Sequence, residues 1–293
     1  MSNFAFLISA VLLLIFSVPA FSENRVTILY DAFSKSDEMQ RDWGFSAFIE
    51  FNGQRILFDS GNNAEIFRDN IAKSNIDLSR VDYAVISHRH GDHTTGLNHL
   101  LKINPHVPVY APDEKFGLFG GHIRGSFYKR DTKLPKHMQI YVGQPPKRIQ
   151  SGTPWSNAEF NAVKEVTEVS DGVFILPNVS RTVGTMELKE LSLALKTKRG
   201  MVLIVGCSHP GITNIIAKVK EIDPRVHNVF GGFHLLNKTP EELSRITSTL
   251  KEEYQVENIA PGHCTGEPAF GAFSKSFGDR YVYAGLGESI EIP

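Results

Sequence analysis

The sequence has few of the features that hold small or fibrous proteins together. Only two cysteines, Cys207 and Cys264, occur in 293 residues, so a disulfide framework is excluded. Heptads, internal repeats and low-complexity tracts are absent, which excludes coiled coils and solenoids. The net charge is only −1 and gives no reason to expect nucleic acid as a partner. With 41% hydrophobic residues, the length suits one large globular domain or two smaller ones.

The N-terminal segment contains no lysine or arginine and is almost wholly apolar over residues 4–21. Pro19 breaks the run, and Ala20-Phe21-Ser22 is typical of a secretory cleavage site. We therefore expect a signal peptide at residues 1–22, a mature domain at 23–293, and export to the periplasm or medium. If the segment stays uncleaved, its length of about 18 apolar residues would just span a bilayer and anchor the protein.

Short apolar runs bounded by turn residues predict an α/β protein. Strands are expected at 26–31, 45–51, 55–59, 81–87, 107–111, 172–177, 191–197, 201–206, 227–232, 257–262 and 280–292, with Asn52-Gly53 as a tight hairpin turn. Helices are expected at 63–75, 94–103, 212–222 and 240–254. Strands followed by alternating strands and helices predict sheets sandwiched between helical layers, an αββα arrangement.

Residues at about 115–160 lose this periodicity and form a predicted basic insertion. Between residues 115 and 150, eight lysines and arginines accompany one acid, Asp131. The segment is either a solvated loop or a mobile cover that draws an anionic small-molecule substrate towards a cleft. In the second case Arg124, Lys129 and Arg130 are candidate substrate-binding residues.

The densest group of reactive side chains is Ser-His-Arg-His-Gly-Asp-His, at residues 87–93. His88 and His90 follow a predicted buried strand, two residues apart, and Asp92 and His93 stand at the turn into a helix. Neutral imidazole and carboxylate are the ligands that hold Zn²⁺ and similar ions. These residues therefore predict a metal site.

Three later histidines follow apolar strands in the same way: His209 in GCSHPG, His234 in GGFHL and His263 in APGHCTG. Because ligands gather at the carboxyl ends of strands in α/β sheets, we expect one convergent site. His209 and His263 are candidate metal ligands, and His234 is either a ligand or a contact for substrate.

A strand followed by HxHxDH, an earlier FDSG and a late PGH resemble the metallo-β-lactamase superfamily. Within it, LFDSG, SHRHGDHTTGL, GCSHPGI, GGFHL, PGHCTG and FGDRY are similar to the dihydropterin-6-methyl-ribofuranosylaminobenzene-phosphate synthase-like metal hydrolases, from about residue 26 to the end. The resemblance implies the metallo-β-lactamase fold and one or two metal ions. Zinc is expected, with manganese or iron as alternatives.

The resemblance also implies individual roles. His88 and His90 serve a first metal, and Asp92, His93 and His263 serve a second, with Asp92 also a candidate proton acceptor. Asp59 orients the metal loop without binding the ion.

The sequence departs from the superfamily pattern where an aspartate normally bridges two metals. Cys207 occupies that position, and His209 replaces a histidine that is missing earlier in the chain. Cys207 is either a ligand, a buried inert thiol or half of a disulfide with Cys264.

Three functions are consistent with these residues. The first is an exported hydrolase of a small ester, lactone, amide or phosphoester, which uses metal-activated water. The second is the pterin condensation of the similar subgroup, against which export counts because pterin intermediates are cytoplasmic. The third is a non-catalytic metal-binding or ligand-binding protein on the same fold. We expect no nucleic-acid partner.

Overall fold

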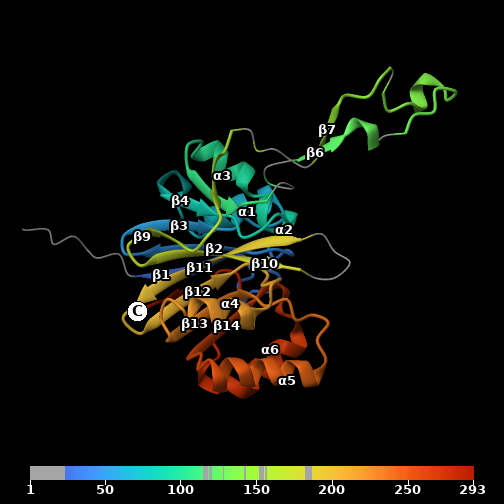
Figure 1. Ribbon diagram of the computed structural model, residues 1–293. Helices are drawn as coiled ribbons and strands as arrows, with labels where there is room; N and C mark the ends of the chain where they lie inside the picture. Colours follow the sequence, from blue (N-terminus) through green and yellow to red (C-terminus); the bar gives the residue numbers. More distant parts are fainter. Residues whose placement is uncertain are drawn as a thin grey trace, which may run out of the picture.

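The structure, a computed structural model, describes residues 24–114, 118, 121–127, 129–141, 143–151, 155, 157–181 and 187–293. The predicted signal peptide therefore lies outside the described residues. Within them, two mixed sheets pack face to face and helices cover both outer faces, which confirms the αββα sandwich (Figure 1). No helix in this part of the chain is long and apolar enough to cross a membrane.

The first sheet has the strand order β15-β1-β2-β3-β4-β5-β8. Its strands are β1 (Arg25–Tyr30), β2 (Ser46–Phe51), β3 (Gln54–Phe58), β4 (Tyr83–Val85), β5 (Pro108–Pro112), β8 (Glu159–Val163) and β15 (Ser289–Glu291). The β2–β3 hairpin turns at Asn52 and Gly53, whose positive φ angles of 49° and 79° suit a tight two-residue turn. Strands β3, β4, β5 and β8 are parallel, so their carboxyl ends lie at one edge.

The second sheet has the order β14-β13-β12-β11-β10-β9. Its strands are β9 (Thr167–Ser170), β10 (Val173–Ser180), β11 (Leu188–Thr197), β12 (Gly200–Val205), β13 (Val226–Gly232) and β14 (Asn258–Gly262). The run β12-β13-β14 is parallel and fully or nearly buried, as expected for strands covered on both faces. These three strands also end at a common edge.

Three apolar layers hold the sandwich together. The central layer packs alternate residues of both sheets, including Phe58, Val85, Ile204 and Phe230. Helices α1 (Ala64–Lys73), α2 (Gly91–Thr94) and α3 (Leu97–Ile103) lie beside the first sheet, where α1 and α3 pack through residues such as Phe67. Helices α4 (Ile212–Val219), α5 (Pro240–Ser248) and α6 (Glu267–Phe277) cover the second sheet.

Two parts of the predicted pattern are wrong. Residues 280–292 do not form one strand: only β15 pairs with β1, because the chain turns at Gly287, which has a φ of 90°. Helix α6 is absent from the sequence prediction, although it has Pro268 in its first turn and buries every fourth residue, Ala269, Phe273 and Phe277. The predicted helix at 240–254 is α5 followed by a π-helical turn at Thr249–Glu253.

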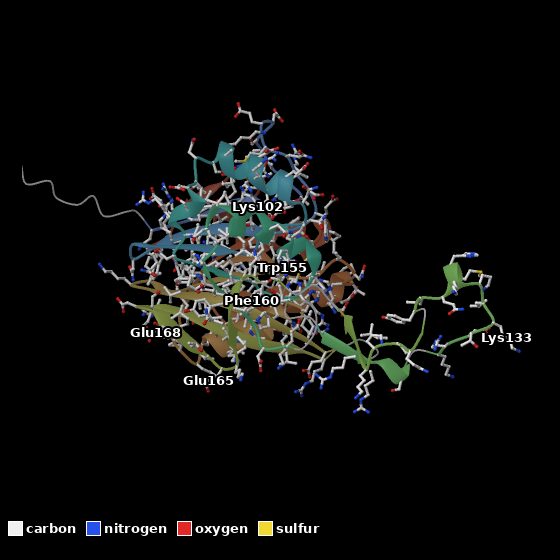
Figure 2. The ribbon with its side chains drawn as sticks, turned by 90° about the horizontal axis from the view of Figure 1, so that it is seen from above. Lys102, Lys133, Trp155, Phe160, Glu165 and Glu168 are labelled. Atoms are coloured by element: carbon white, nitrogen blue, oxygen red, sulfur yellow. The ribbon has the colours of Figure 1, made fainter. Side chains whose placement is uncertain are left out.

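The predicted insertion forms an arm whose described part contains a hairpin of β6 (Gly121–Arg124) and β7 (Arg148–Ser151) and two short 3₁₀ turns, Gly125–Phe127 and Lys136–Met138. Figure 1 shows this arm projecting from the sandwich rather than lying across it. In Figure 2, Lys133 stands at the distal part of the arm, whereas Trp155 and Phe160 lie against the body. The chain rejoins the first sheet at β8.

Candidate metal centre

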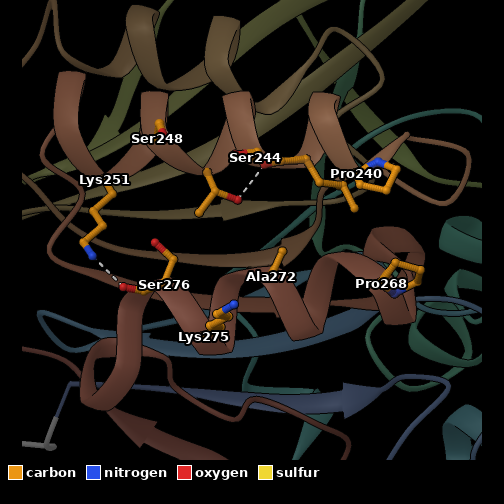
Figure 3. A pocket seen from close by; sticks show the side chains of 10 residues that line it. Pro240, Ser244, Ser248, Lys251, Pro268, Ala272, Lys275 and Ser276 are labelled. Carbon is orange, nitrogen blue, oxygen red and sulfur yellow. Dashed lines mark hydrogen bonds between the residues drawn. The ribbon is translucent and has the colours of Figure 1, made fainter.

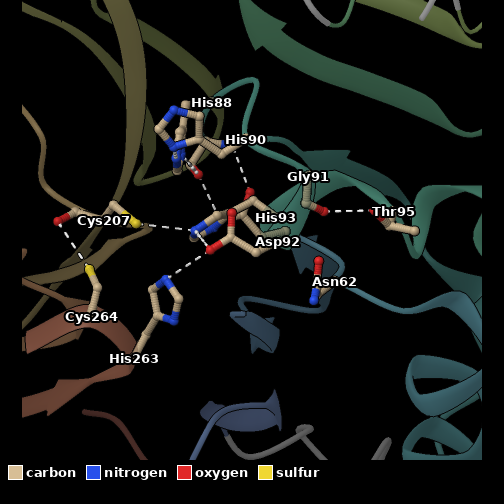
Figure 4. Close-up of polar contacts among 12 residues, drawn as sticks. Asn62, His88, His90, Gly91, Asp92, His93, Thr95, Cys207, His263 and Cys264 are labelled. Carbon is tan, nitrogen blue, oxygen red and sulfur yellow. Dashed lines mark hydrogen bonds and ion pairs between the residues drawn. The ribbon is translucent and has the colours of Figure 1, made fainter. Parts of the chain in front are cut away.

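The strand ends of both sheets bring the predicted ligands together. His88, His90, Asp92 and His93 follow β4 in the first sheet, whereas His209, His234 and His263 follow β12, β13 and β14 in the second. Figure 4 shows the loop at 88–93 facing His263 and Cys207 across the edge of the sandwich. The convergence predicted from the sequence is therefore what the fold produces.

One group consists of His88, His90 and His209, whose candidate ligand nitrogens lie within 4.8 Å of one another. Burial, followed by the neighbouring imidazoles, lowers the pKa of His88 well below its usual value. Burial and the charges of His234 and His90 lower the pKa of His209 to about 3. Both rings are therefore neutral at pH 7, which is the form that coordinates a metal.

A second group consists of Asp92, His93 and His263. Asp92 Oδ2 lies 3.7 Å from His93 Nε2 and 3.5 Å from His263 Nε2. Ligand atoms around a tetrahedral zinc ion are roughly 3.4 Å apart, given metal–ligand bonds of about 2.0–2.2 Å. Burial alone would raise the pKa of Asp92, but the nearby imidazoles of His263 and His93 lower it. The carboxylate is therefore ionised and suited to a cation.

The unpartnered atoms of the cluster provide an independent test of whether a metal fits. Among the described residues, His209 Nε2 and both ring nitrogens of His263 are buried without a hydrogen-bond partner. Leaving buried polar atoms unpaired costs about 1–3 kcal/mol each. An ion held by these imidazoles would satisfy such atoms, so the residues fit one or two metal ions.

Asp59 holds the loop that carries the cluster through hydrogen bonds to His93 and Ser87. It accepts hydrogen bonds from His93 Nδ1 at 2.7 Å and from Ser87 N and Oγ at 2.6 Å each. Burial would lower the pKa of His93, but the charge and hydrogen bond of Asp59 raise it to about 9, so an ion that binds His93 would have to displace the proton on Nε2. Asp59 is fully buried, so it is placed to hold the loop at residues 88–93 from inside the fold, in agreement with the orienting role that the resemblance implies. Gly206 leaves space for the Asp59–Ser87 pair, because a Cβ at this position would lie 2.3 Å from Ser87 Oγ and 3.0 Å from Asp59 Oδ2.

Backbone strain is concentrated at the same place. Asp59, Ser208, His234 and His263 all have positive φ angles, between 45° and 62°. Non-glycine residues rarely adopt this conformation, which costs about 1–3 kcal/mol and tends to occur at functional sites. The four residues follow four different strands, so the strain turns four separate loops towards one centre.

Comparison with known proteins agrees with this geometry. The family model for the metallo-β-lactamase superfamily matches residues 44–194. A 7,8-dihydropterin-6-methyl-4-(β-D-ribofuranosyl)-aminobenzene-5′-phosphate synthase from Methanocaldococcus jannaschii is 30% identical over 271 residues, covering 86% of this chain and 90% of the relative.

Solved structures give the same result. A metal-dependent hydrolase of the β-lactamase superfamily superposes with a TM-score of 0.70 at 26% identity, covering 92% of this chain and 99% of the other. A diphosphatase superposes with a TM-score of 0.53, covering 92% of this chain and 98% of the other, and its 15% identity shows the fold alone. The chain belongs to the metallo-β-lactamase superfamily.

Cys207 is the residue at which this member departs from the superfamily pattern. Its Sγ lies 3.2 Å from His93 Nε2 and, with His88 and His93, forms a further group of candidate ligands. Cys207 and Cys264 are both buried and neither forms a disulfide. Burial and then the neighbouring Cys264 raise the pKa of the Cys207 thiol, with smaller contributions from Glu190 and Asp92. Its sulfur therefore lies among the candidate ligand atoms, and the choice between a ligand and an inert buried thiol stays a prediction.

Two buried acids that support the site were missed in the sequence. Glu190 in β11 accepts hydrogen bonds from the backbone amides of Cys207, Ser208 and His209 at 2.7–3.0 Å. Burial raises its pKa to about 7, despite these donors. Asp31 accepts from the amide of His263 at 3.0 and 3.1 Å. An acid inside or at the end of an apolar strand was the available signal for both.

Trp43 is a further residue that sequence analysis missed. Its ring centroid lies 4.8 Å from that of His263, and 44% of the residue is exposed. An exposed indole beside a candidate ligand is a surface on which a flat or apolar part of a substrate can pack.

The predicted substrate-binding residues are not brought to this centre. Arg124 and Lys129 are exposed on the arm and Arg130 is partly exposed there. Because the arm projects from the body in Figure 1, it does not cover the cluster in this structure. The solvated loop and the mobile cover both stay predictions, since a projecting arm is consistent with either.

A separate groove of about 590 Å³ lies between α5 and α6, where Figure 3 shows Lys251 and Ser276 linked across it. Its lining includes Leu243, Ala272 and Lys275 and none of the cluster residues. The groove is therefore distinct from the metal centre.

Proposed function

We propose that this protein is a metal-dependent hydrolase of a small ester, lactone, amide or phosphoester. The proposal rests on two adjacent groups of candidate ligands, in each of which the ligand atoms lie within 4.8 Å of one another. The groups are His88, His90 and His209, and Asp92, His93 and His263. One or two ions, zinc by preference and manganese or iron as alternatives, fit these donors. When bound, such ions supply Lewis-acid polarisation of the substrate and activation of water at neutral pH.

The residues of the chain supply position and charge for this reaction. The side chain of Asp92 is 19% exposed and lies on the solvent side of His93 and His263, which are both buried. Its lowered pKa makes it a weak proton acceptor, so a ligand role is favoured over general base catalysis. Asp59 and Glu190 hold the two loops that carry the ligands, so the site is organised before substrate arrives.

The test begins with metal content. The purified full chain should contain one to two equivalents of transition metal, and His88→Ala should lose metal and activity together. His99→Ala, on α3 and outside the ligand groups, is the matched control and should keep both. Elemental analysis that finds no metal, with no binding on titration, would overturn the proposal.

Substrate class is then tested with a panel of ester, lactone, β-lactam and phosphodiester substrates. Hydrolysis of any one class that is lost on chelation and restored by zinc supports the proposal. Metal binding without turnover of any compound would favour a non-catalytic binding protein.

A second candidate function is favoured by the Methanocaldococcus relative, which covers nearly the same length. It is the condensation of a dihydropterin with a phosphorylated ribofuranosylaminobenzene. The two candidates separate in one assay, because the synthase joins the pterin and aminobenzene parts in one product and releases the leaving group of the pterin substrate, whereas the hydrolase adds water across one bond of a single substrate.

Export is a separate expectation that bears on this choice. N-terminal sequencing of protein recovered from its native host should find Glu23 as the first residue, outside the cytoplasm. Soluble cytoplasmic protein that begins at Met1 or Ser2 would overturn export and strengthen the synthase.

A further inference from the structure

We propose that Cys207, Cys264 and His234 form a third metal position, specific for thiophilic ions such as Zn²⁺ and Cd²⁺, beside the superfamily centre. The two sulfurs and an imidazole nitrogen lie within 4.8 Å of one another. Two thiolates and one imidazole are a donor set that tetrahedral zinc accepts, with a fourth position left for solvent or substrate.

Three adjacent strand ends supply the three donors. Cys207 follows β12, His234 follows β13 and Cys264 follows β14. These loops are fastened to one another: Ser208 Oγ donates to Gly232 O at 2.7 Å, and Leu235 N donates to Cys264 O at 3.3 Å. Hydrogen bonds between the loops therefore fix the relative positions of the three candidate metal ligands.

Gly232 and the backbone of His234 make the position possible. A Cβ at Gly232 would lie 2.7 Å from Cys264 Sγ, so any side chain there would displace the sulfur. His234 has a φ of 51°, and the ring lies 4.3 Å from the ring of His209. Tetrahedral zinc holds two sulfurs and a nitrogen roughly 3.5–3.8 Å apart, so small side-chain rotations close the group around an ion.

Burial and access also suit an ion at this position. Cys207 and Cys264 are 3% and 1% exposed, whereas His234 is exposed and opens the group to solvent. Cys264 Sγ donates a long hydrogen bond to Cys207 O at 3.6 Å, which holds it beside Cys207. Cys207 Sγ faces His93 on one side and this group on the other, and a thiolate sulfur can bridge two ions.

The test uses Cys264 and His234, which have no role in the superfamily centre proposed above. Metal-depleted full chain is titrated with Cd²⁺, and the ultraviolet thiolate-to-cadmium absorption is measured with the stoichiometry. The parent protein should show the absorption of two thiolates. Cys264→Ser should lower it to about half and bind one Cd²⁺ fewer, and His234→Gln should weaken that equivalent at least about tenfold. His227→Gln, a histidine outside all the ligand groups, should match the parent.

A second measurement does not require a variant to fold. Thiol alkylation is mapped by mass spectrometry at a urea concentration at which the metal-depleted parent protein reacts at both cysteines, and Cd²⁺ should then block it at both Cys207 and Cys264. Protection of Cys207 alone, a Cys264→Ser variant with parental absorption and stoichiometry, or a stable Cys207–Cys264 disulfide in the native protein would overturn the proposal. Each of these results would leave the hydrolase proposal intact, because the His88–His93 loop is untouched.

Discussion

The carboxylate of Asp59 accepts a hydrogen bond from Nδ1 of His93 across 2.7 Å, and both side chains are fully buried. This bond fixes the ring so that its other nitrogen, Nε2, faces Asp92 and Cys207. Asp59→Asn keeps the shape but removes the charge, so we expect metal affinity to fall about 10- to 100-fold. Competition with a chelator of known affinity measures the change.

Asp77→Asn is the matched control for that experiment, because Asp77 is an exposed acid that caps a 3₁₀ turn and asparagine caps equally well. It should leave metal affinity unchanged. If Asp59→Asn binds metal as tightly as the parent protein, the buried pair does not orient the site.

Glu190 should be needed for the loop that carries Cys207 and His209. In Glu190→Gln an amide NH₂ group replaces one acceptor oxygen and opposes a backbone N–H, which leaves a buried donor unpaired. We expect a loss of about 2–3 kcal/mol in the free energy of unfolding, measured by urea denaturation, and a lower metal content. The exposed Glu291→Gln should change neither. A variant of full stability and metal content would show that the charge of Glu190 is dispensable.

Much of this arrangement could be predicted from the sequence because the strands are apolar runs bounded by turns. The parallel order of β12, β13 and β14 places residues 207–209, 234 and 263 at one edge of the sheet. The alternation of strands with helices along the sequence is enough to predict this parallel order. Asp31 and Glu190 could not be assigned, because their partners are backbone amides distant in sequence. The path of the arm could not be predicted either, since its Gly-rich and Pro-rich sequence has no apolar face to fix it against the body.

Asp223 gives a stability prediction outside the site. Its carboxylate accepts from the side chain of Arg225 at 2.8 Å and from the Arg225 amide at 2.9 Å, and these bonds lower its pKa to about 2. The folded pKa lies below the usual value, so the stabilisation is complete above about pH 4 and is lost as pH falls towards 2. We expect Asp223→Asn to cost about 1 kcal/mol at pH 7, a value kept small because Arg225 is solvent-exposed.

Urea denaturation at pH 7, 4.5 and 3 measures this difference. The gap between parent and Asp223→Asn should narrow at the lowest pH, whereas the exposed Asp171→Asn should show no gap at any pH. A difference that stays constant between pH 7 and 3 would contradict an ionic origin.

Trp43 should affect substrate binding more than chemistry. Its exposed ring beside His263 can stack with a planar group, and such contacts contribute about 0.5–1.5 kcal/mol. Trp43→Ala should therefore raise KM for an aromatic substrate about three- to tenfold, with kcat and metal content little changed. Trp43→Phe should restore most of the loss. An equal rise in KM for an aliphatic analogue would show that stacking is not the cause.

The basic arm is the final feature to test, because Arg124, Lys129 and Arg130 lie on a segment that projects from the sandwich. Charges held at a distance act through their field, and the Debye length falls from about 10 Å at 0.1 M salt to about 3 Å at 1 M. Replacing all three by glutamine should lower kcat/KM for an anionic substrate about tenfold at low salt, and the difference should vanish at 1 M. Metal content should be unchanged.

A matched triple variant at Lys133, Lys136 and Lys147 removes the same charge elsewhere on the arm and should have a smaller effect. If the two variants behave alike, only total charge matters. If the first loses activity even at 1 M salt, one of its residues makes a direct contact when the arm closes, worth about 1–3 kcal/mol. Parental kinetics at low salt would show that the arm is a solvated loop with no part in substrate capture.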